Sequence, residues 1–390
     1  MMKADGVIRA LLFSLLLIGC RTQKQPGLGE PLADLTPAQR REFEEGKQAF
    51  QRVFEPKDGL GPLFNANSCA ECHEQPVVGG TGDEMEVHAT RFVGPNSCDP
   101  LFQEGGPVIQ QHATPLLKAK GIEKEEIPPH ATSQGRRSTS ALFGFGLVDA
   151  VPEATILAHE GRYGANGDGI AGRANRTIDG RVGRFGRKAA VAALHDFNAG
   201  AFPQEMGVTT PLSPVEETIN GTPVPPDTDP APDPEISLEE IERVTAFIRF
   251  LAPPPEQVFT NHHDRHLAKR GRRLFANLNC AVCHIPKLET GPSSIQALDR
   301  KAVALYSDLL LHDMGSELAD ICLERAHPSE FRTELLMGLR FREHFLHDGS
   351  AKTIQEAIER HGGEARKSRD RYKALGDADK NALLKFLQTI

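Results

Sequence analysis

Two short segments, 69–73 and 280–284, place two cysteines and a histidine in the spacing C-x-x-C-H. Two thiols at this spacing form thioether bonds to the vinyl groups of a haem, and the histidine that follows is held against the iron. The sequence therefore predicts two covalent c-type haems. The predicted attachment cysteines and iron ligands are Cys69, Cys72 and His73 for the first haem and Cys280, Cys283 and His284 for the second.

A C-x-x-C pair also occurs in zinc sites and in thioredoxin-like redox pairs. A zinc site would gather four ligands within one small module. These two pairs lie about two hundred residues apart, and both end in histidine. The spacing therefore favours haem attachment over zinc.

The N-terminus has the pattern of an export signal. A lysine at position 3 precedes the apolar stretch 10–18, which is too short to anchor a protein stably across a bilayer. Residues 17–20 read L-I-G-C and resemble a bacterial lipobox, which predicts a signal peptide over 1–20 and a lipid on Cys20. An ordinary signal peptide cut elsewhere would also export the chain. We expect the bacterial periplasm or cell envelope, with membrane contact through the lipid only; Arg21, in place of a retention aspartate, favours the outer membrane.

Cys98 and Cys322 remain after lipid and haem are assigned. In an oxidising compartment they could pair and tie the two halves of the chain together. Two unpaired thiols are the alternative, because sequence alone does not test the geometry.

Composition limits the remaining possibilities. The chain has 390 residues, 39% hydrophobic content and no second apolar stretch of membrane length, so we expect a soluble mature chain large enough for two domains. The net charge of −8 argues against nucleic acid as a partner.

The chain repeats one helical pattern. A Gly-x-x-x-Phe step, at 46–50 and 271–275, precedes each haem segment. The glycine lets another helix approach closely, and the matching segments 246–251 and 382–387 are the helices expected to do so. A further echo relates 139–144 to 333–338. The sequence predicts a mainly α fold of two cytochrome c-like domains, each with one covalent haem, long loops and little β.

Proline runs set the expected boundaries. The run 253–255 cannot continue a helix and ends the first domain, giving domains over 36–252 and 257–390. The proline-rich stretch 211–234 is expected to be an exposed extended loop within the first domain.

Several segments resemble a known family. F-L-H-D-G at 345–349 and T-I-Q-E-A-I at 353–358 resemble bacterial di-haem cytochrome c peroxidases. Other segments are similar to the related di-haem proteins often called thiol oxidoreductases. These are F-G-F-G-L-V at 143–148, G-D-G-I-A-G-R at 167–173, G-R-F-G at 183–186 and L-L-L-H-D-M-G at 309–315. The resemblance covers the chain from about Phe43 to Leu387.

For the first haem, the resemblance implies a distal glutamate within an E-M-G segment, which here is Glu205 at 205–207. Cleavage of the peroxide bond needs a group that moves a proton from the near oxygen to the leaving oxygen, and a carboxylate can do this. The alternative is an exposed glutamate that anchors a loop. His88 lies near the position that the family uses for a sixth ligand, and His112 and His130 are its rivals.

For the second haem, the di-haem peroxidases place a distal methionine fourteen residues after the histidine of H-D-G. Counting from His347 gives His361, which predicts bis-histidine ligation and a haem suited to electron transfer. His361 could instead cap its own helix, and Met314 is a rival ligand. His347 is expected to belong to the haem surroundings.

Two features depart from the family. The chain has no tryptophan, so an electron relay between the haems must use Tyr163, Tyr306, Tyr372 or direct tunnelling. The segment 166–169, N-G-D-G, resembles a calcium loop. Arg162 and Gly164 stand where further oxygen ligands are wanted, which favours a glycine-rich turn.

The resemblance implies a di-haem oxidoreductase that reduces hydrogen peroxide at the first haem. Electrons would enter through the second haem from a small redox protein, a cytochrome c or a cupredoxin. The alternatives are oxidation of a thiol or another organic substrate, and a non-catalytic di-haem electron-transfer protein.

Overall fold

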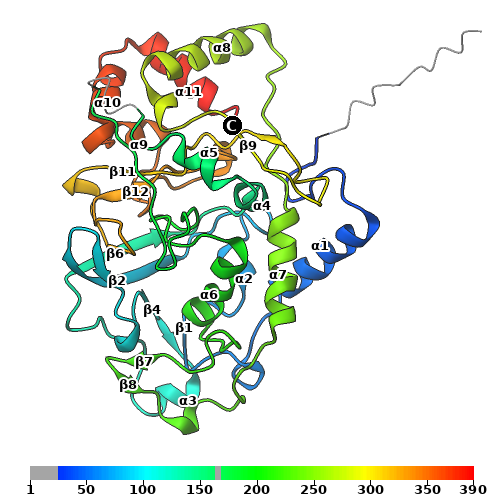
Figure 1. Ribbon diagram of the computed structural model, residues 1–390, viewed down its shortest axis with the longest axis vertical. Helices are drawn as coiled ribbons and strands as arrows, with labels where there is room; N and C mark the ends of the chain where they lie inside the picture. The colour runs from blue at the N-terminus through cyan, green and yellow to red at the C-terminus, as the bar shows by residue number, and fades with distance from the viewer. Residues whose placement is uncertain (1–24, 163–167) are drawn as a thin grey trace, which may run out of the picture.

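The chain folds into helices joined by long loops, with several small sheets (Figure 1). The structure is a computed structural model that describes residues 25–162 and 168–390. The predicted signal peptide 1–20 with Cys20, and Tyr163 with 164–167, lie outside the described residues. Over the two described ranges, no helix combines the length and the apolar character needed to cross a bilayer.

Helices dominate the secondary structure, and most strands are two or three residues long. The α-helices are α1 (Pro37–Phe50), α2 (Cys69–Cys72), α3 (Pro115–Lys118), α4 (Phe145–Asp149), α5 (Glu153–Leu157), α6 (Leu194–Met206), α7 (Leu238–Phe250), α8 (His262–Asn277), α9 (Ile354–Glu359), α10 (Arg366–Lys373) and α11 (Asp377–Leu387). The strands are β1 (Leu63–Phe64), β2 (Met85–Gly94), β3 (Ser97–Asp99), β4 (Val108–Ile109), β5 (His112–Ala113), β6 (Ser133–Ser138), β7 (Thr218–Ile219), β8 (Thr222–Pro223), β9 (Leu288–Glu289), β10 (Ala302–Val303), β11 (Leu311–Asp313) and β12 (Glu330–Arg332). The prediction of a mainly helical chain with little β is confirmed.

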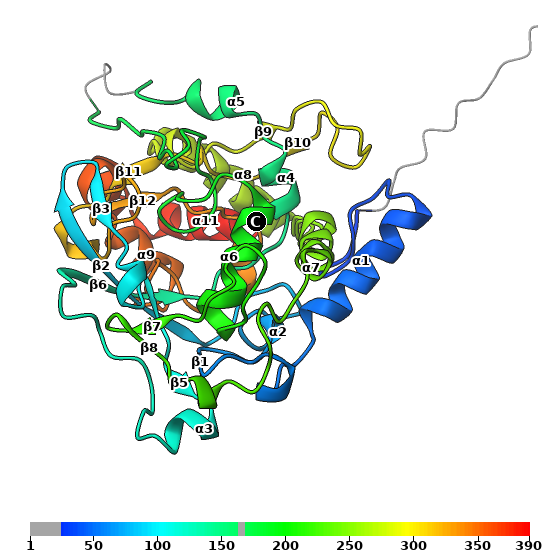
Figure 2. The same ribbon diagram turned by 60° about the horizontal axis from the view of Figure 1, so that its bottom comes forward.

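α1 and α7 lie next to each other in Figures 1 and 2, and Gly46 of α1 lies at their contact. Thr36 caps α1 through a capping box with Gln39. A Cβ on Gly46 would lie 2.2 Å from the carbonyl oxygen of Arg243, so only glycine permits this approach. The ring of Phe247 lies 5.1 Å from the ring of Phe43, on the buried face of α1. The predicted contact between these two helices is confirmed.

α8 and α11 repeat this crossing in the second half of the chain. The side chain of Asn261 caps α8. A Cβ on Gly271 would lie 2.0 Å from the carbonyl oxygen of Ala382. The rings of Phe275 and Phe386 are 5.4 Å apart in the same interface. The same residue pattern therefore produces the same close helix contact twice.

The main hydrophobic core draws on both halves of the chain. It includes Phe247 of α7 together with Leu309, Leu310 and Leu335 from the second half. A second, smaller cluster lies between α8 and α11 and contains Tyr306 and Tyr372. The proline-rich stretch 211–234 is mostly exposed and contains the β7–β8 hairpin. The domain boundaries at 252 and 257 stay a prediction.

The longest strand pairing joins β2 and β6, which lie next to β11 and β12 in both ribbon views. The register places Glu86 directly opposite Arg137. A carboxylate of Asp320 forms ion pairs of 2.8 Å with both Arg137 and Lys188. These three side chains are at most 6% exposed. The buried ion pairs therefore connect the β2–β6 ribbon, the antiparallel pair of these two strands, to Asp320 in the second half of the chain.

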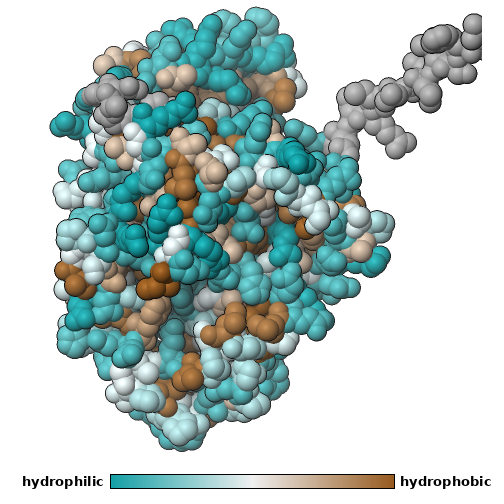
Figure 3. Space-filling view, in the orientation of Figure 1, coloured by the Kyte–Doolittle hydropathy of each residue, from teal (hydrophilic) through white to brown (hydrophobic). Residues whose placement is uncertain are grey.

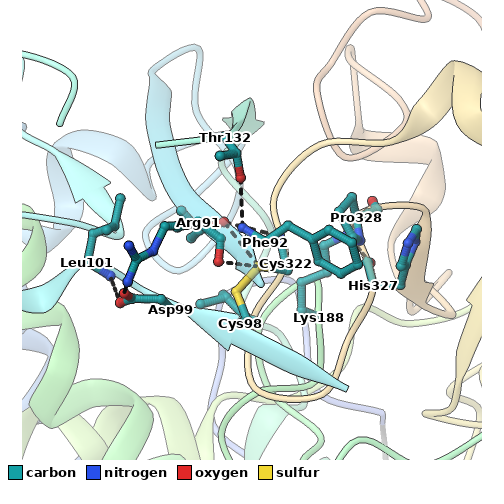
Figure 4. Close-up of a disulfide and its surroundings, with 12 residues drawn as sticks. Arg91, Phe92, Cys98, Asp99, Leu101, Thr132, Lys188, Cys322, His327 and Pro328 are labelled. Atoms are coloured by element: carbon teal, nitrogen blue, oxygen red, sulfur yellow. Dashed lines mark hydrogen bonds and ion pairs between the residues drawn. A yellow bond between two sulfur atoms is a disulfide. The ribbon is translucent and has the colours of Figure 1, made fainter. Parts of the chain in front are cut away.

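Cys98 and Cys322 form a disulfide between β3 and the loop after Asp320 (Figure 4). Their Cα atoms are 5.7 Å apart. Cys322 is fully buried, and its backbone N–H donates to Oγ1 of Thr90 on β2. Of the two alternatives that the sequence left open, the structure forms the disulfide, which ties the first half of the chain to the second.

Replacing both Cys98 and Cys322 with serine should lower the free energy of unfolding by about 2–4 kcal/mol, because the bond restricts a long loop of the unfolded chain. The bond spans a separation of 224 residues. Chemical denaturation with and without a thiol reductant measures the effect. The reductant should destabilise the wild type and leave the double variant unchanged; equal midpoints for both proteins without reductant would contradict this prediction.

Candidate functional site

The first C-x-x-C-H segment forms α2 and the residue after it, and its side chains line a cavity of about 70 Å³. Ser68 caps the helix, and Cys69 and Cys72 are unpaired. Nδ1 of His73 lies 3.1 Å from the carbonyl oxygen of Gly80. A carbonyl oxygen only accepts, so Nδ1 carries the proton of the neutral ring and Nε2 is the nitrogen with a lone pair for a metal.

The second C-x-x-C-H segment repeats this arrangement at a larger cavity, of about 220 Å³. Cys280 and Cys283 line it and are unpaired. Nδ1 of His284 lies 2.9 Å from the carbonyl oxygen of Tyr306, which again leaves Nε2 free. Burial raises the pKa of Cys280 to about 12, so the unmodified side chain is a thiol.

His361 also lines the second cavity. Its Nδ1 lies 2.7 Å from the carbonyl oxygen of Ala357, in the same arrangement as the two motif histidines. Burial, followed by the charge of His361, lowers the pKa of His284 to about 4, and burial also lowers the pKa of His361. Both rings are therefore neutral, which is the form that binds iron. Met314, the rival ligand, lines the same cavity. Ligation by His361 stays a prediction.

Glu205 lines the first cavity from the last turn of α6. Its backbone oxygen accepts from the N–H groups of Asn65 (2.7 Å) and Ala66 (3.1 Å). The side-chain amide of Asn65 donates to Oε2 of Glu205 at 3.2 Å. Because Asn65 and Ala66 lead directly into the first haem segment, these bonds hold Glu205 on the same cavity as His73.

A second carboxylate, Glu86 on β2, lines the same cavity and was missed in the sequence. Its Oε2 lies 2.8 Å from Nε2 of His88, and the β2–β6 register places it opposite Arg137. The available signal was the alternation of a strand, which puts Glu86 and His88 on one face. The sequence does not show that this face meets the cavity.

The environments of the two carboxylates push their pKa values apart. Burial, and then the negative charge of Glu86, raise the pKa of Glu205 well above its ordinary value. Burial opposes ionisation of Glu86 as well, but His88, His73 and Arg137 outweigh it and lower the pKa of Glu86. The cavity therefore combines a protonated acid with an ionised carboxylate, a pairing typical of acid–base sites.

The three histidines considered as a sixth ligand of the first haem lie outside the lining of the cavity. His88 pairs with Glu86, and its Nδ1 is buried without a hydrogen-bond partner among the described residues. His112 is exposed and packs against Phe64. His130 is exposed and pairs with Glu104. The structure thus places Glu205 in the lining of the first cavity. His88 lies outside that lining, in contact with Glu86.

His347 lines the second cavity, as part of its surroundings. Its ring stacks on Phe331 with the centroids 4.2 Å apart. Its backbone oxygen accepts from the N–H of Ser138 at 2.9 Å, next to Arg137 on β6. A single β ribbon therefore separates residues that line the two cavities. Tyr306 and Tyr372, the described candidates for an electron relay, lie in the α8–α11 cluster. Neither of them lines either of these two cavities.

The segment 166–169, where a glycine-rich turn is favoured over a calcium loop, is only partly described, since Asn166 and Gly167 lie outside the described residues. Asp168 accepts from the side-chain amide of Asn279 at 2.7 Å and lies 3.3 Å from Arg371. Both of its oxygens thus have protein partners, which is in keeping with a turn that supports the second haem segment.

The residues fit two covalently held haems. In each cavity, two unpaired thiols precede a histidine whose Nδ1 donates to a backbone carbonyl, and the chain around them is mainly helical. This combination is typical of di-haem proteins. The family model described as "Di-haem oxidoreductase, putative peroxidase" matches residues 128–390, and the chain belongs to this family.

Three solved structures are similar to the chain. The hydrazine synthase of Kuenenia stuttgartiensis is 15% identical, with full coverage of both chains and a TM-score of 0.42. The diheme peroxidase BthA of Burkholderia thailandensis is 15% identical, with 93% and 87% coverage of this chain and that chain and a TM-score of 0.40. A MauG-like protein associated with microbial copper homeostasis is 16% identical, with 97% and 95% coverage and a TM-score of 0.39. No curated protein matches the chain.

Proposed function

We propose that the chain is a di-haem c-type oxidoreductase that reduces hydrogen peroxide to two waters at the first haem. The reaction consumes two electrons and two protons, and the electrons arrive through the second haem. The observation that carries the proposal is the pair Glu205 and Glu86, which line the cavity of His73 with opposite pKa shifts. When bound, the first haem supplies the iron at which peroxide is reduced.

Glu205 is the proton-transfer group. Its Oε2 accepts from Asn65, so the proton of the neutral acid resides on Oε1. From there it can pass to the leaving oxygen of a bound peroxide. Glu86 stays ionised between His88 and Arg137, and its charge helps to keep Glu205 protonated. His88 in this arrangement holds Glu86 in place.

The second cavity is proposed as the electron-relay site, with His284 and His361 as the iron ligands and Cys280 and Cys283 as the attachment points. In the first cavity, Cys69 and Cys72 attach the haem and His73 is the proximal ligand. Neutral histidines on both sides of an iron give a low-potential haem that favours electron transfer over substrate binding.

The proposed compartment is the bacterial periplasm or cell envelope, with lipid on Cys20. The disulfide between Cys98 and Cys322 supports export, because such bonds persist in oxidising compartments. The proposed domains are 36–252 and 257–390, each with one haem. The two glycine helix crossings, one in each domain, support this division.

The proposed electron donor is a small cytochrome c or cupredoxin with an acidic docking face. Ser368 and Arg369 of α10 line the second cavity. The end of the molecule that carries α8 and α10 is mostly hydrophilic in Figure 3. The basic residues of these two helices are Arg265, Lys269, Arg270, Arg272, Arg273, Arg366, Lys367, Arg369, Arg371 and Lys373. Arg270, Arg272, Arg369 and Arg371 are ion-paired with carboxylates. Basic residues still outnumber acidic ones on both helices, which would attract an acidic partner in a salt-dependent way.

Spectroscopy and turnover of the purified protein test the proposal. We expect two covalent haems per chain, one of them high-spin and able to bind cyanide or peroxide in some redox state. Peroxide should then be reduced with reduced cytochrome c as donor. Two low-spin haems that bind neither ligand would leave an electron-transfer protein. Turnover of thiols with an oxidised acceptor, without peroxide turnover, would replace peroxide as the substrate.

A further inference from the structure

Three arginines and one glutamate meet in the wall of the second cavity. Nη1 of Arg187 lies 2.6 Å from Oε2 of Glu334, and Nη1 of Arg342 lies 2.8 Å from Oε1. Nη2 of Arg332 lies 3.5 Å from Oε2. All four side chains line the cavity of His284. These four residues form the arginine cluster.

The arginine cluster carries an excess of two positive charges, because three guanidiniums meet one carboxylate. The side chains of Arg187, Arg332 and Arg342 are 13%, 4% and 11% exposed, and that of Glu334 is 24% exposed. Burial opposes ionisation of Glu334, but the three guanidiniums outweigh it and hold the pKa of Glu334 below its ordinary value. Charge that is withdrawn from water in this way is costly unless an opposite charge compensates it.

Backbone groups position the guanidiniums without neutralising them. Nε of Arg332 donates to the carbonyl oxygen of Gly186 at 3.0 Å, and Nη2 of Arg342 donates to that of Leu335 at 2.6 Å. Nε of Arg342 is buried and has no hydrogen-bond partner among the described residues. Asp308 also acts on Arg332, but it is itself paired with His312 at 2.9 Å. The arginine cluster is therefore pre-arranged for an anionic ligand.

We propose that the arginine cluster binds the two propionate carboxylates of the haem that Cys280 and Cys283 hold. The proposal rests on the haem-binding part of the proposed function and is independent of peroxide as substrate. Two ionised propionates match the excess charge, and planar guanidiniums bind carboxylates through paired N–H donors. The first cavity differs, since its described lining contains Glu86 and Glu205 but no lysine or arginine.

This site would join the two predicted domains through the cofactor. Arg187 belongs to the stretch 36–252, whereas Arg332 and Arg342 belong to 257–390. Nη2 of Arg187 also donates to the carbonyl oxygen of Ser138, which is on the ribbon between the cavities, at 3.1 Å. The second haem would thus be held by its thioethers on one side and by residues of both domains on the other.

Holoprotein variants with two readouts test the proposal. Arg342→Gln removes one positive charge from the arginine cluster, and Glu334→Gln removes its only negative charge. Arg340→Gln is the matched control, because Arg340 donates to the carbonyl oxygen of Pro255 and is not part of the cavity lining. The readouts are the propionate bending bands in resonance Raman spectra and the reduction potential of the second haem against pH.

We expect the wild type and Arg340→Gln to share the same bending bands and the same weak pH dependence from pH ~5 to ~8, above the ordinary carboxyl pKa. In Arg342→Gln the bands should shift. A propionate pKa should also rise into this range, so that the potential falls as pH rises. In Glu334→Gln the bands should shift and the potential should rise. Unchanged bands and an unchanged pH profile in Arg342→Gln, with both haems bound, would overturn the proposal.

A lysine variant and an addition of phosphate complete the test. If Arg342→Gln fails to retain its haem, Arg342→Lys keeps the positive charge but loses the paired N–H donors of the guanidinium. This variant should shift the bending bands and leave the potential nearly independent of pH. Unshifted bands would overturn the proposal. Inorganic phosphate added to the wild type should change neither readout; a change would assign the site to a free anion instead. The pH profiles are compared as differences from the wild type, because other titratable or charged groups also line the cavity: His284, His312, His347, His361 and Arg369.

Discussion

Glu205→Gln is expected to lower peroxide turnover by about 10²- to 10⁴-fold, the usual contribution of a positioned acid–base group. Glutamine keeps the shape of the side chain and the bond that Asn65 donates, but it has no proton to transfer from Oε1. Both haems should remain bound, because the attachment cysteines and the proximal histidines are untouched. Steady-state assays with peroxide and a reduced cytochrome c measure the change.

Glu125→Gln is the matched control for this variant. Glu125 is a buried acid, 2% exposed, whose pKa burial raises to about 9, and it lies outside the lining of both cavities. Its loss should leave turnover unchanged. A Glu205→Gln protein that keeps the turnover of the wild type would remove Glu205 from the mechanism.

The pH profile gives a second test of Glu205. Turnover requires the protonated acid, so activity should be present below the raised pKa of Glu205 and should fall as pH rises through it. The residual activity of Glu205→Gln should lack this alkaline decline. A decline of the same size in both proteins would assign it to another group.

Gly271→Ala and Gly46→Ala are each expected to lower the free energy of unfolding by about 1–3 kcal/mol, the usual cost of overpacking. The added Cβ would lie 2.0 Å from the carbonyl oxygen of Ala382 in the first case and 2.2 Å from that of Arg243 in the second. Each contact is with helix backbone, so the two crossing helices must move apart. Chemical denaturation of the holoprotein measures the loss.

Gly200→Ala in α6 is the control with the same chemical change. The nearest atom to its added Cβ is the end of the Gln204 side chain, at 3.9 Å. Alanine there should raise the free energy of unfolding by about 0.5–1 kcal/mol, because it favours the helix. Stabilisation by Gly271→Ala or Gly46→Ala as well would contradict the close crossings.

Local patterns accounted for the parts of the fold that could be predicted. The caps of α1 and α7, made by the side chains of Thr36 and Ser237, depend only on residues within one turn. The glycines at 46 and 271 indicated close helix contacts, because a missing Cβ has a direct steric consequence. The partners of these glycines followed from the repetition of the same pattern in each half of the chain.

Other parts of the site depended on the long-range arrangement of the chain. Glu86 reaches the first cavity through the register of β2 and β6, which the residues of one strand do not specify. The pairing of Cys98 with Cys322 required the distance between segments 224 residues apart.

The sequence by itself determined the two C-x-x-C-H segments, the family resemblance and the helix pattern around each segment, because these are set by covalent spacing and by helical periodicity. Only the tertiary structure decided which charged side chains meet. Arg187 and Glu334 are 147 positions apart, and each reads in the sequence as an ordinary charged residue. Their meeting in one cavity wall, like that of Glu86 and Glu205 in the other, depends on packing between distant segments.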